Sequence, residues 1–258
     1  MKKLTFLGVL ASVLIISGCA SNNAQQQAES NADPRDPIEP FNRVMWDFNY
    51  DVLDAYLLRP VTVGYTTVMP GFARTGLLNA ALNLEEPVNM VNNLLQGKAE
   101  PSMRSFARFL INTTVGLVGT IDVAEKMGMP RVEEDFDEVL GVWGVGNGPY
   151  VMLPAAGPND VRGLVGSAVD NAYFPMTYLN GNFTLLRVVV ELLESRAQLM
   201  AQEQQLDNSA DPYAFVKSAY FQNKEFKVTD GKSGEKEIDE EALDDFDAFE
   251  AFLDDSGN

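Results

Sequence analysis

The sequence predicts an all-α protein that a lipid anchor holds at a membrane. Apolar residues recur at helical spacing along most of the chain, and no strand-period alternation persists long enough to build a sheet, so at most one hairpin is expected beside the helices, with the glycine-rich stretch as an irregular loop or hairpin. A cysteine follows a short apolar segment near the N-terminus, and an uncharged glycine-rich run interrupts the helical pattern near the middle. The expected organisation is therefore a signal peptide (1–18), a lipid anchor and flexible tether (19–35), a helical domain (36–222) and an acidic, largely disordered tail (223–258).

The N-terminal segment predicts a secreted lipoprotein. Lys2 and Lys3 precede an apolar core too short to span a membrane, and small residues follow it, which is typical of a secretory signal. Cys19 is the only cysteine and stands where a lipoprotein acquires diacylglycerol; in the alternative, the signal is cut elsewhere and Cys19 is incidental. Ala20 stands where inner-membrane lipoproteins carry Asp. We therefore expect a lipid-anchored protein on the periplasmic face of the outer membrane.

The body of the chain predicts a series of helices. The first is apolar around most of its circumference, as in a helix central to a core or embedded in a membrane. We expect Asp36 to cap it and Pro60 to break the chain after it. A cap is also expected at Asp211, before the last helix. The expected helices cover residues 41–58, 72–84, 86–96, 101–118, 134–142, 159–173, 182–205 and 212–221.

The run from Val139 to Asn159 has no charged residue, but its glycines and prolines forbid a regular helix. Irregular backbone at membrane depth must be covered by protein or line a cavity. Two interpretations remain open from the pattern alone. The run is either part of a body sunk into one leaflet and facing an internal passage, or a surface loop on an ordinary core.

The end of the chain is strongly acidic. Residues 237–258 hold ten acidic residues and no basic one, as disordered and solvated ends often do. Four apolar residues recur there every three positions, a spacing that also suits a helix that folds into the groove of a partner. These candidate docking residues are Leu243, Phe246, Phe249 and Phe252.

The composition argues against an enzyme and against several ligands. The formal charge of −18 argues against nucleic acid as a partner. The chain has no histidine, which excludes a Ser-His-Asp triad and the usual zinc sites. The glycines of residues 144–148 lack the Lys-Ser/Thr ending of a nucleotide loop. Asp135 and Asp137 are interpreted as charges at a helix start rather than paired catalytic carboxylates, so no catalytic residue, cofactor or metal is expected.

Several ordered segments together resemble the MlaA (VacJ) family of outer-membrane lipoproteins. The resemblance covers roughly residues 33–222, and its most distinctive block begins at Leu140. The matching segments are Asp36–Arg43, Asn83–Pro87, Leu94–Gly97, Arg108–Phe109, Gly119–Asp122, Leu140–Tyr150, Leu153–Pro154, Asp211–Tyr213 and Ala219–Phe221.

The resemblance implies a flat, ring-like and monotopic helical domain in the inner leaflet of the outer membrane, beside trimeric porins. It also implies removal of misplaced phospholipid from the outer leaflet and transfer to a soluble periplasmic carrier similar to MlaC. The glycine-rich stretch would act as a mobile gate; Arg162 lacks the acidic residues that follow it in relatives, which puts a charged rim in doubt. The candidate passage or gate residues are Gly141, Trp143, Gly144, Gly146, Gly148, Pro149, Tyr150, Arg162 and Asp170.

Two other functions share the anchor and the apolar body. A structural lipoprotein would scaffold porins or the envelope without binding lipid in its interior. A lipid hydrolase would need a catalytic base other than histidine, and it would release fatty acid from labelled phospholipid.

Overall fold

The computed structural model describes residues 33–173, 175 and 178–232. The chain divides into two compact units, Met1–Pro37 and Ile38–Asn258. In the described part of the first unit, Arg35 forms an ion pair with Asp33 at 2.9 Å. The second unit holds every described helix and strand.

The second unit is helical with one β-hairpin, which confirms the predicted fold class. β1 (Tyr150–Leu153) pairs antiparallel with β2 (Gly157–Asp160), and Tyr150 lies opposite Asp160. The helices are α3 (Glu39–Asp47), the π-helix η1 (Phe48–Leu58), α4 (Arg59–Val68), α5 (Gly71–Asn83), α6 (Glu86–Leu95), α7 (Ala99–Thr114), α8 (Val123–Lys126), α9 (Phe136–Val142), α10 (Val161–Asp170), α11 (Gly181–Leu199), the 3-10 helix η3 (Met200–Gln202), α12 (Glu203–Asp207) and α13 (Pro212–Val228).

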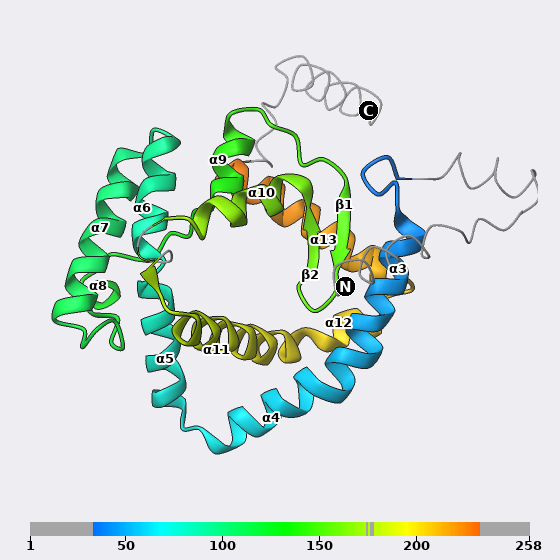
Figure 1. Cartoon of the computed structure of the whole chain (residues 1–258), viewed down its shortest axis with the longest axis horizontal. Helices are drawn as coiled ribbons and strands as arrows, with labels where there is room; N and C mark the ends of the chain where they lie inside the picture. Colours follow the sequence, from blue (N-terminus) through cyan, green and yellow to red (C-terminus); the bar gives the residue numbers. More distant parts are fainter. Residues whose placement is uncertain (1–32, 174, 176–177, 233–258) are drawn as a thin grey trace, which may run out of the picture. The chain divides into compact units, whose positions relative to one another are not determined.

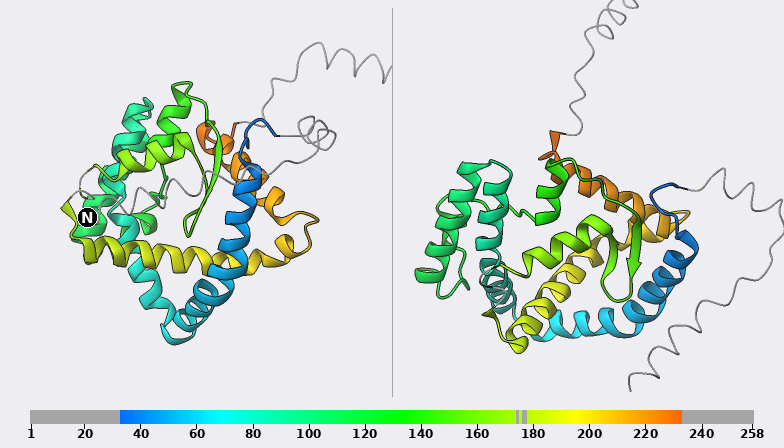
Figure 2. Two further views of the ribbon diagram at one scale, coloured as in Figure 1. Left: turned by 45° about the vertical axis from the view of Figure 1, so that its right-hand side comes forward. Right: turned by 45° about the horizontal axis from the view of Figure 1, so that its top comes forward.

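Within this unit the helices follow one another around a ring (Figure 1). α4 and α5 contact α11, α5 and α6 contact α7, and α6 also contacts α9. α9 packs on α10 and α13, and α3 packs on β1. The hairpin lies against α10 and α13 as well (Figure 2), so the glycine-rich run is bordered by helices from both halves of the sequence.

Two expectations for the first helix were wrong. Helix α3 begins at Glu39 with Ile38 at the cap position, not after Asp36, and its early proline suits the first turn of a helix. Pro60 does not break the chain, because η1 continues directly into α4. Pro60 is the second residue of α4, directly after the π-helix, so the change from π-helical to α-helical hydrogen bonding falls at the residue that has no N–H to donate.

Three helix ends differ from the prediction. α7 ends at Thr114 instead of Val118, and the expected last residues Leu117 and Val118 adopt left-handed backbone with φ of 53° and 59°, which an α-helix does not contain. The long helix expected over 182–205 becomes 3-10 at Met200–Gln202. α13 runs to Val228, so helix continues past residue 222, where the tail was expected to begin. The predicted cap of α13 is confirmed, since the Asp211 side chain accepts a hydrogen bond from the N–H of Ala214 at 3.1 Å.

The distribution of polarity is unusual. Among the residues described, twenty polar or charged side chains are buried against ten apolar ones, and the apolar core cluster consists of Tyr150, Met152, Tyr213 and Phe221. Many large apolar side chains face outward instead, and Val68 and Phe72 are each 83% exposed. Helix α3 is apolar on two sides: Phe41 and Val44 are exposed, whereas Met45 and Trp46 are partly buried and pack against the core cluster.

In residues 33–173, 175 and 178–232, no helix is both long enough and apolar enough to cross a bilayer.

Candidate functional site

The predicted passage residues gather on α9, the segment that follows it, the start of β1 and α10. Helix α9 starts with a capping box, in which the Asp135 side chain accepts from the N3 backbone and Glu138 reaches back to the N–H of Asp135 at 3.2 Å. This arrangement confirms that Asp135 marks a helix start. Gly141 lies inside α9, and Trp143 caps its C-terminus, where its indole N–H donates to the Leu95 carbonyl at 3.3 Å.

Gly141 and Tyr150, near the two ends of the glycine-rich run, are packed. A Cβ on Gly141 would lie 2.5 Å from Cγ2 of Val228 and 2.9 Å from Nη1 of Arg162. Tyr150 is fully buried, and its ring packs edge-on against Tyr213, 6.3 Å away. Both residues therefore serve close packing in this structure.

The middle of the run has more freedom. Gly144 and Gly148 have φ of +87° and +71°, which few residues other than glycine adopt. Gly146 is exposed, and a Cβ there would meet nothing within 4 Å. Pro149 is exposed as well and leads directly into β1.

Arg162 ties this middle part to α10. Its backbone N–H donates to the Asn147 carbonyl at 3.0 Å, and its Nη1 donates to the Val145 carbonyl, also at 3.0 Å. The side chain is buried, and Nε lies 3.7 Å from Oδ1 of Asp137. The predicted passage residue Arg162 therefore holds the backbone of the glycine-rich segment in place.

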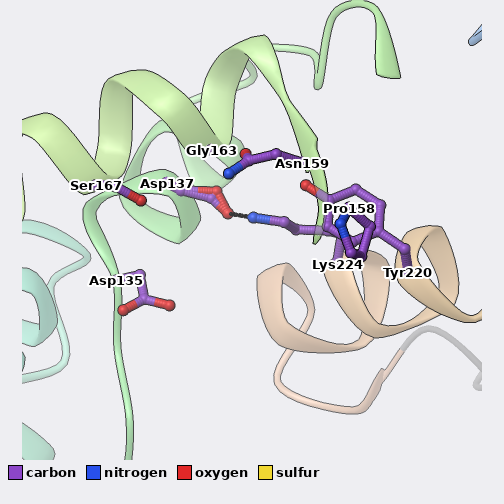
Figure 3. A pocket seen from close by; sticks show the side chains of 8 residues that line it. All are labelled: Asp135, Asp137, Pro158, Asn159, Gly163, Ser167, Tyr220 and Lys224. Atoms are coloured by element: carbon purple, nitrogen blue, oxygen red, sulfur yellow. Dashed lines mark hydrogen bonds and ion pairs between the residues drawn. The ribbon is translucent and has the colours of Figure 1, made fainter. Parts of the chain in front are cut away.

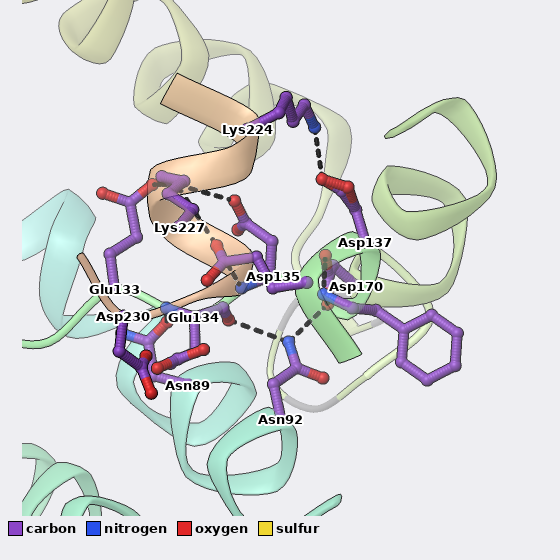
Figure 4. A network of polar contacts seen from close by, with 12 residues as sticks. Asn89, Asn92, Glu133, Glu134, Asp135, Asp137, Asp170, Lys224, Lys227 and Asp230 are labelled. Atoms are coloured by element: carbon purple, nitrogen blue, oxygen red, sulfur yellow. Dashed lines mark hydrogen bonds and ion pairs between the residues drawn. The ribbon is translucent and has the colours of Figure 1, made fainter. Parts of the chain in front are cut away.

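Asp170 lies in a polar junction of α6, α9 and α10 (Figure 4). Its Oδ1 accepts from Nδ2 of Asn92 at 2.8 Å, and its Oδ2 accepts from the N–H of Phe136 at 3.0 Å. The same Asn92 amide donates to the Glu134 carbonyl at 2.9 Å. Burial raises the pKa of Asp170 to about 6. Asp170 thus joins three helices rather than standing alone on a rim.

Lys227 of α13 completes this junction (Figure 4). Its Nζ lies 3.2 Å from Oδ2 of Asp135 and 3.3 Å from both Oε1 of Glu133 and Oε1 of Glu138. The neighbouring carboxylates raise the pKa of Lys227 against the effect of burial, while burial raises the pKa of Glu138 to about 8. No local sequence pattern indicates Lys227, because its partners lie almost a hundred positions away along the chain.

A polar pocket of ≈ 160 Å³ adjoins this junction, between α9, β2, α10 and α13 (Figure 3). Asp137 and Lys224 point toward each other across it and form an ion pair. The pocket is lined by Asp135, Asp137, Pro158, Asn159, Gly163, Ser167, Tyr220 and Lys224. None of these positions was predicted as a site.

The other predicted sites lie outside the described residues. These are the lipidation site Cys19 and the candidate docking residues Leu243, Phe246, Phe249 and Phe252. Within the part of the chain that the structure describes, no group of three or more His, Cys, Asp or Glu side chains could hold a metal ion.

Comparison with known proteins gives a consistent result. A family profile described as MlaA lipoprotein matches residues 34–227. The chain is 38% identical to the intermembrane phospholipid transport system lipoprotein MlaA of Haemophilus influenzae, over 90% of this chain and 93% of that protein. It is 40% identical to the protein of the same name from Escherichia coli, over 89% of this chain and 91% of that protein. An uncharacterized protein of Rickettsia felis is 35% identical over 75% of this chain and 78% of that protein.

The fold is also similar to a solved structure. That chain comes from work on the structural basis for maintenance of bacterial outer membrane lipid asymmetry. It superposes with a TM-score of 0.72 at 45% sequence identity, covering 75% of this chain and 98% of the other.

Proposed function

The chain belongs to the MlaA lipoprotein family, and from this premise we propose that it removes mislocalised phospholipid from the outer leaflet of the outer membrane. It is a component of intermembrane phospholipid transport and maintains lipid asymmetry. It acts in the cell envelope, on the periplasmic side of the outer membrane, and passes the lipid to a soluble periplasmic carrier. It works by passive passage and not by catalysis.

The observation that carries this proposal is the inverted polarity of the helical unit. A water-soluble surface rarely carries extended apolar patches, yet α4, α5, α7 and α11 all expose large apolar side chains. Sinking these faces into one leaflet would bury them in hydrocarbon. Polar residues gathered toward the inside would then offer a lipid headgroup a route while its acyl chains stay in hydrocarbon.

The proposed gate is the glycine-rich segment after α9. Gly144 and Gly146 are exposed and an added Cβ would meet nothing within 4 Å, so a change in their backbone angles displaces no packed side chain; Gly148 lies closer to α10, where an added Cβ would be 3.1 Å from Cβ of Val161. Arg162 holds the carbonyls of Val145 and Asn147, so the gate would open by releasing or rotating about these two bonds. Trp143 and Pro149 would bound the moving part on either side.

Attachment and partners complete the proposal. A diacylated Cys19 would keep the protein at the membrane, since each buried methylene contributes about 0.8 kcal/mol. Trimeric porins would lie beside the ring, as the resemblance to the MlaA family implies. The acidic tail with Leu243, Phe246, Phe249 and Phe252 would dock on the carrier.

The test is the level of outer-leaflet phospholipid in a strain lacking the protein, complemented by wild type or by Cys19→Ala. We expect a raised level in the deletion strain that wild type alone restores. A level that does not rise on deletion would favour the scaffold function instead. Release of fatty acid from labelled phospholipid by the purified protein would favour a hydrolase.

Gly144→Val separates the gate from the fold. The substitution forces a β-branched residue into left-handed backbone, and we expect surface phospholipid to stay raised while the protein remains folded. The matched control is Gly97→Val on the turn after α6, which also has positive φ, +79°, and open space around it. Equal rescue by both variants would argue against the gate.

A further inference from the structure

The pocket between α9, β2, α10 and α13 has hydrogen-bond donors and acceptors that no other described residue satisfies. Asp137 is buried and its Oδ2 pairs with Lys224, while its Oδ1 accepts no hydrogen bond within the described part of the chain and has Nε of Arg162 as its nearest cation, 3.7 Å away. Nδ2 of Asn159 and Oγ of Ser167 donate no hydrogen bond to another described residue. A buried carboxylate oxygen without a donor costs free energy unless a ligand or water satisfies it.

The charges at the pocket walls come in opposite pairs. Lys224 faces Asp137, and Tyr220 on the same helix donates to Oδ2 of Asp160 at 2.9 Å. Asp135 adds a half-exposed carboxylate near the opening, held on one side by Lys227 at 3.2 Å. The carboxylates of Asp135 and Asp137 would repel a ligand that carries only negative charge. The ammonium of Lys224 would repel a ligand that carries only positive charge. A ligand that carries both charges can satisfy both walls.

The size of the pocket limits the ligand to a small polar group. Its volume of ≈ 160 Å³ is well below the roughly 300–1,000 Å³ of the pockets that enclose drug-sized ligands. Two acyl chains do not fit this space. Gly163 keeps part of it open, because a Cβ there would lie 2.6 Å from Oδ1 of Asn159 and 3.2 Å from Nζ of Lys224.

We infer that this pocket binds the zwitterionic headgroup of a phospholipid, with the phosphate toward Lys224 and Asn159 and the ammonium toward Asp137 and Asp135. This inference rests on the proposed function, which supplies the lipid. The pocket would bind headgroups that carry an amine more tightly than anionic headgroups that carry only hydroxyls. It lies next to the segment held by Arg162, whose Nε is 3.7 Å from the same Asp137.

The first measurement compares soluble probes on the full-length, lipid-anchored protein in non-ionic detergent. The probes are short-chain phosphatidylethanolamine, short-chain phosphatidylglycerol and free O-phosphoethanolamine, and isothermal titration calorimetry gives each Kd. We expect the ethanolamine lipid to bind at least about tenfold more tightly than the glycerol lipid. Equal affinities, or no binding of the ethanolamine lipid, would overturn the inference. Tight binding of free O-phosphoethanolamine together with weak binding of the lipid would show that the ligand is a soluble compound, which also overturns it.

The second measurement is the lipid affinity of a variant in which a larger side chain fills the pocket. Ser167 is exposed on α10, so Ser167→Met can fill the opening without displacing a packed side chain. We expect it to lower the affinity for the ethanolamine lipid about tenfold, to the level of the glycerol lipid. The matched control is Val165→Met, also exposed on α10 but outside the pocket. Unfolding temperatures equal to wild type confirm that both variants are folded, and a preference retained in Ser167→Met would overturn the assignment.

These results are separable from the test of transport. If deletion raises surface phospholipid and wild type restores it, while the purified protein shows no headgroup preference, only the pocket assignment fails. If the headgroup preference is present but deletion leaves surface phospholipid unchanged, the proposed transport fails and the pocket remains a lipid-binding site.

Discussion

Arg108 of α7 and Glu86 of α6 form an ion pair in which Nε and Oε1 are 2.6 Å apart and the two side chains are 2% and 1% exposed. The same guanidinium donates through Nη2 to Oδ2 of Asp122 at 2.7 Å. Three segments that the sequence separates by up to 36 positions therefore meet at one buried cation. Such pairs do not by themselves prove stability, but removal of one partner strands a charge.

Substitution of Arg108 by Met should destabilise the protein strongly. It leaves the buried Glu86 with only the more distant cation of Arg131, whose Nε is 3.9 Å from Oε1, and should lower the free energy of unfolding by about 3–5 kcal/mol. Chemical denaturation of the purified protein measures the change. The control is Arg104→Met on the same helix, whose partner Glu100 is 76% exposed, and it should cost less than about 1 kcal/mol. Similar losses in both variants would show that the Arg108 cluster is not specially buried in solution.

Two glycine-to-alanine substitutions should change the free energy of unfolding in opposite directions. A Cβ on Gly166 of α10 would lie 2.6 Å from the backbone N of Asp137, so Gly166→Ala must push α9 and α10 apart and should cost about 1–3 kcal/mol. Gly64 lies inside α4 with nothing within 4 Å of its added Cβ. Gly64→Ala should therefore raise the free energy of unfolding by about 0.5–1 kcal/mol. The pair is compared by thermal unfolding; stabilisation by Gly166→Ala would contradict the packing of α9 on α10, and destabilisation by Gly64→Ala would contradict the open space at Gly64.

Stability should fall as pH rises through the titration of Asp170. Burial raises its pKa from 3.8 to about 6 in the folded protein. Below 3.8 the carboxyl is protonated in both states; between 3.8 and about 6 the folded protein keeps a proton that the unfolded chain releases. The neutral form of Asp170 therefore stabilises the folded protein fully below pH 3.8, and this contribution is lost once the pH has risen through about 6.

Asp170→Asn tests this dependence, because the amide stays neutral and its oxygen can still accept from Phe136. We expect the free energy of unfolding of the variant to change less than that of wild type between pH 4 and pH 6. Denaturant titrations at several pH values in this window measure the slope. A slope identical to wild type would assign the dependence to other carboxyls, such as Glu85, whose pKa burial raises to about 7.

Val118 stores backbone strain at an exposed position. Its φ of 59° is rarely adopted by a β-branched residue, and its side chain is 74% exposed. Val118→Asn should raise the free energy of unfolding in detergent-free buffer by about 1 kcal/mol, because Asn tolerates left-handed backbone. If the apolar side chain meets lipid, as the proposed function implies, the same variant should remove surface phospholipid less efficiently. A loss of stability would show that Val118 is packed rather than strained.

The sequence predicted what depends on local patterning. Most helices appear close to their expected positions, because apolar spacing and caps such as Asp211 are local signals. It failed at Pro60, where the preceding helix is a π-helix that no spacing rule anticipates. It missed the partners of Asp170 and Lys224, because contacts between residues about 80 positions apart follow from packing. It placed Tyr150 on the passage, whereas the hairpin turns this ring into the aromatic core.

The candidate site was found only in outline. The glycine-rich segment was predicted from its lack of charge, and the structure adds that Arg162 fastens it. The pocket around Lys224 had no signal, because its lining comes from four elements and contains no motif. The role of this pocket in headgroup binding and the role of the passage residues in lipid transport are predictions that the experiments above test.

The excess of buried polar side chains over buried apolar ones has a consequence for where this chain can be stable. If the exposed apolar faces lie in lipid, as the proposed function implies, the hydrophobic effect no longer favours burying these faces inside the protein. Hydrogen bonds and ion pairs between buried side chains, such as those of Asn92 and Arg108, must then determine the native arrangement. Hydrogen bonds and ion pairs do not weaken in a surrounding of low dielectric constant, so under the proposed function the same internal contacts would hold the helical unit together in water and against a bilayer.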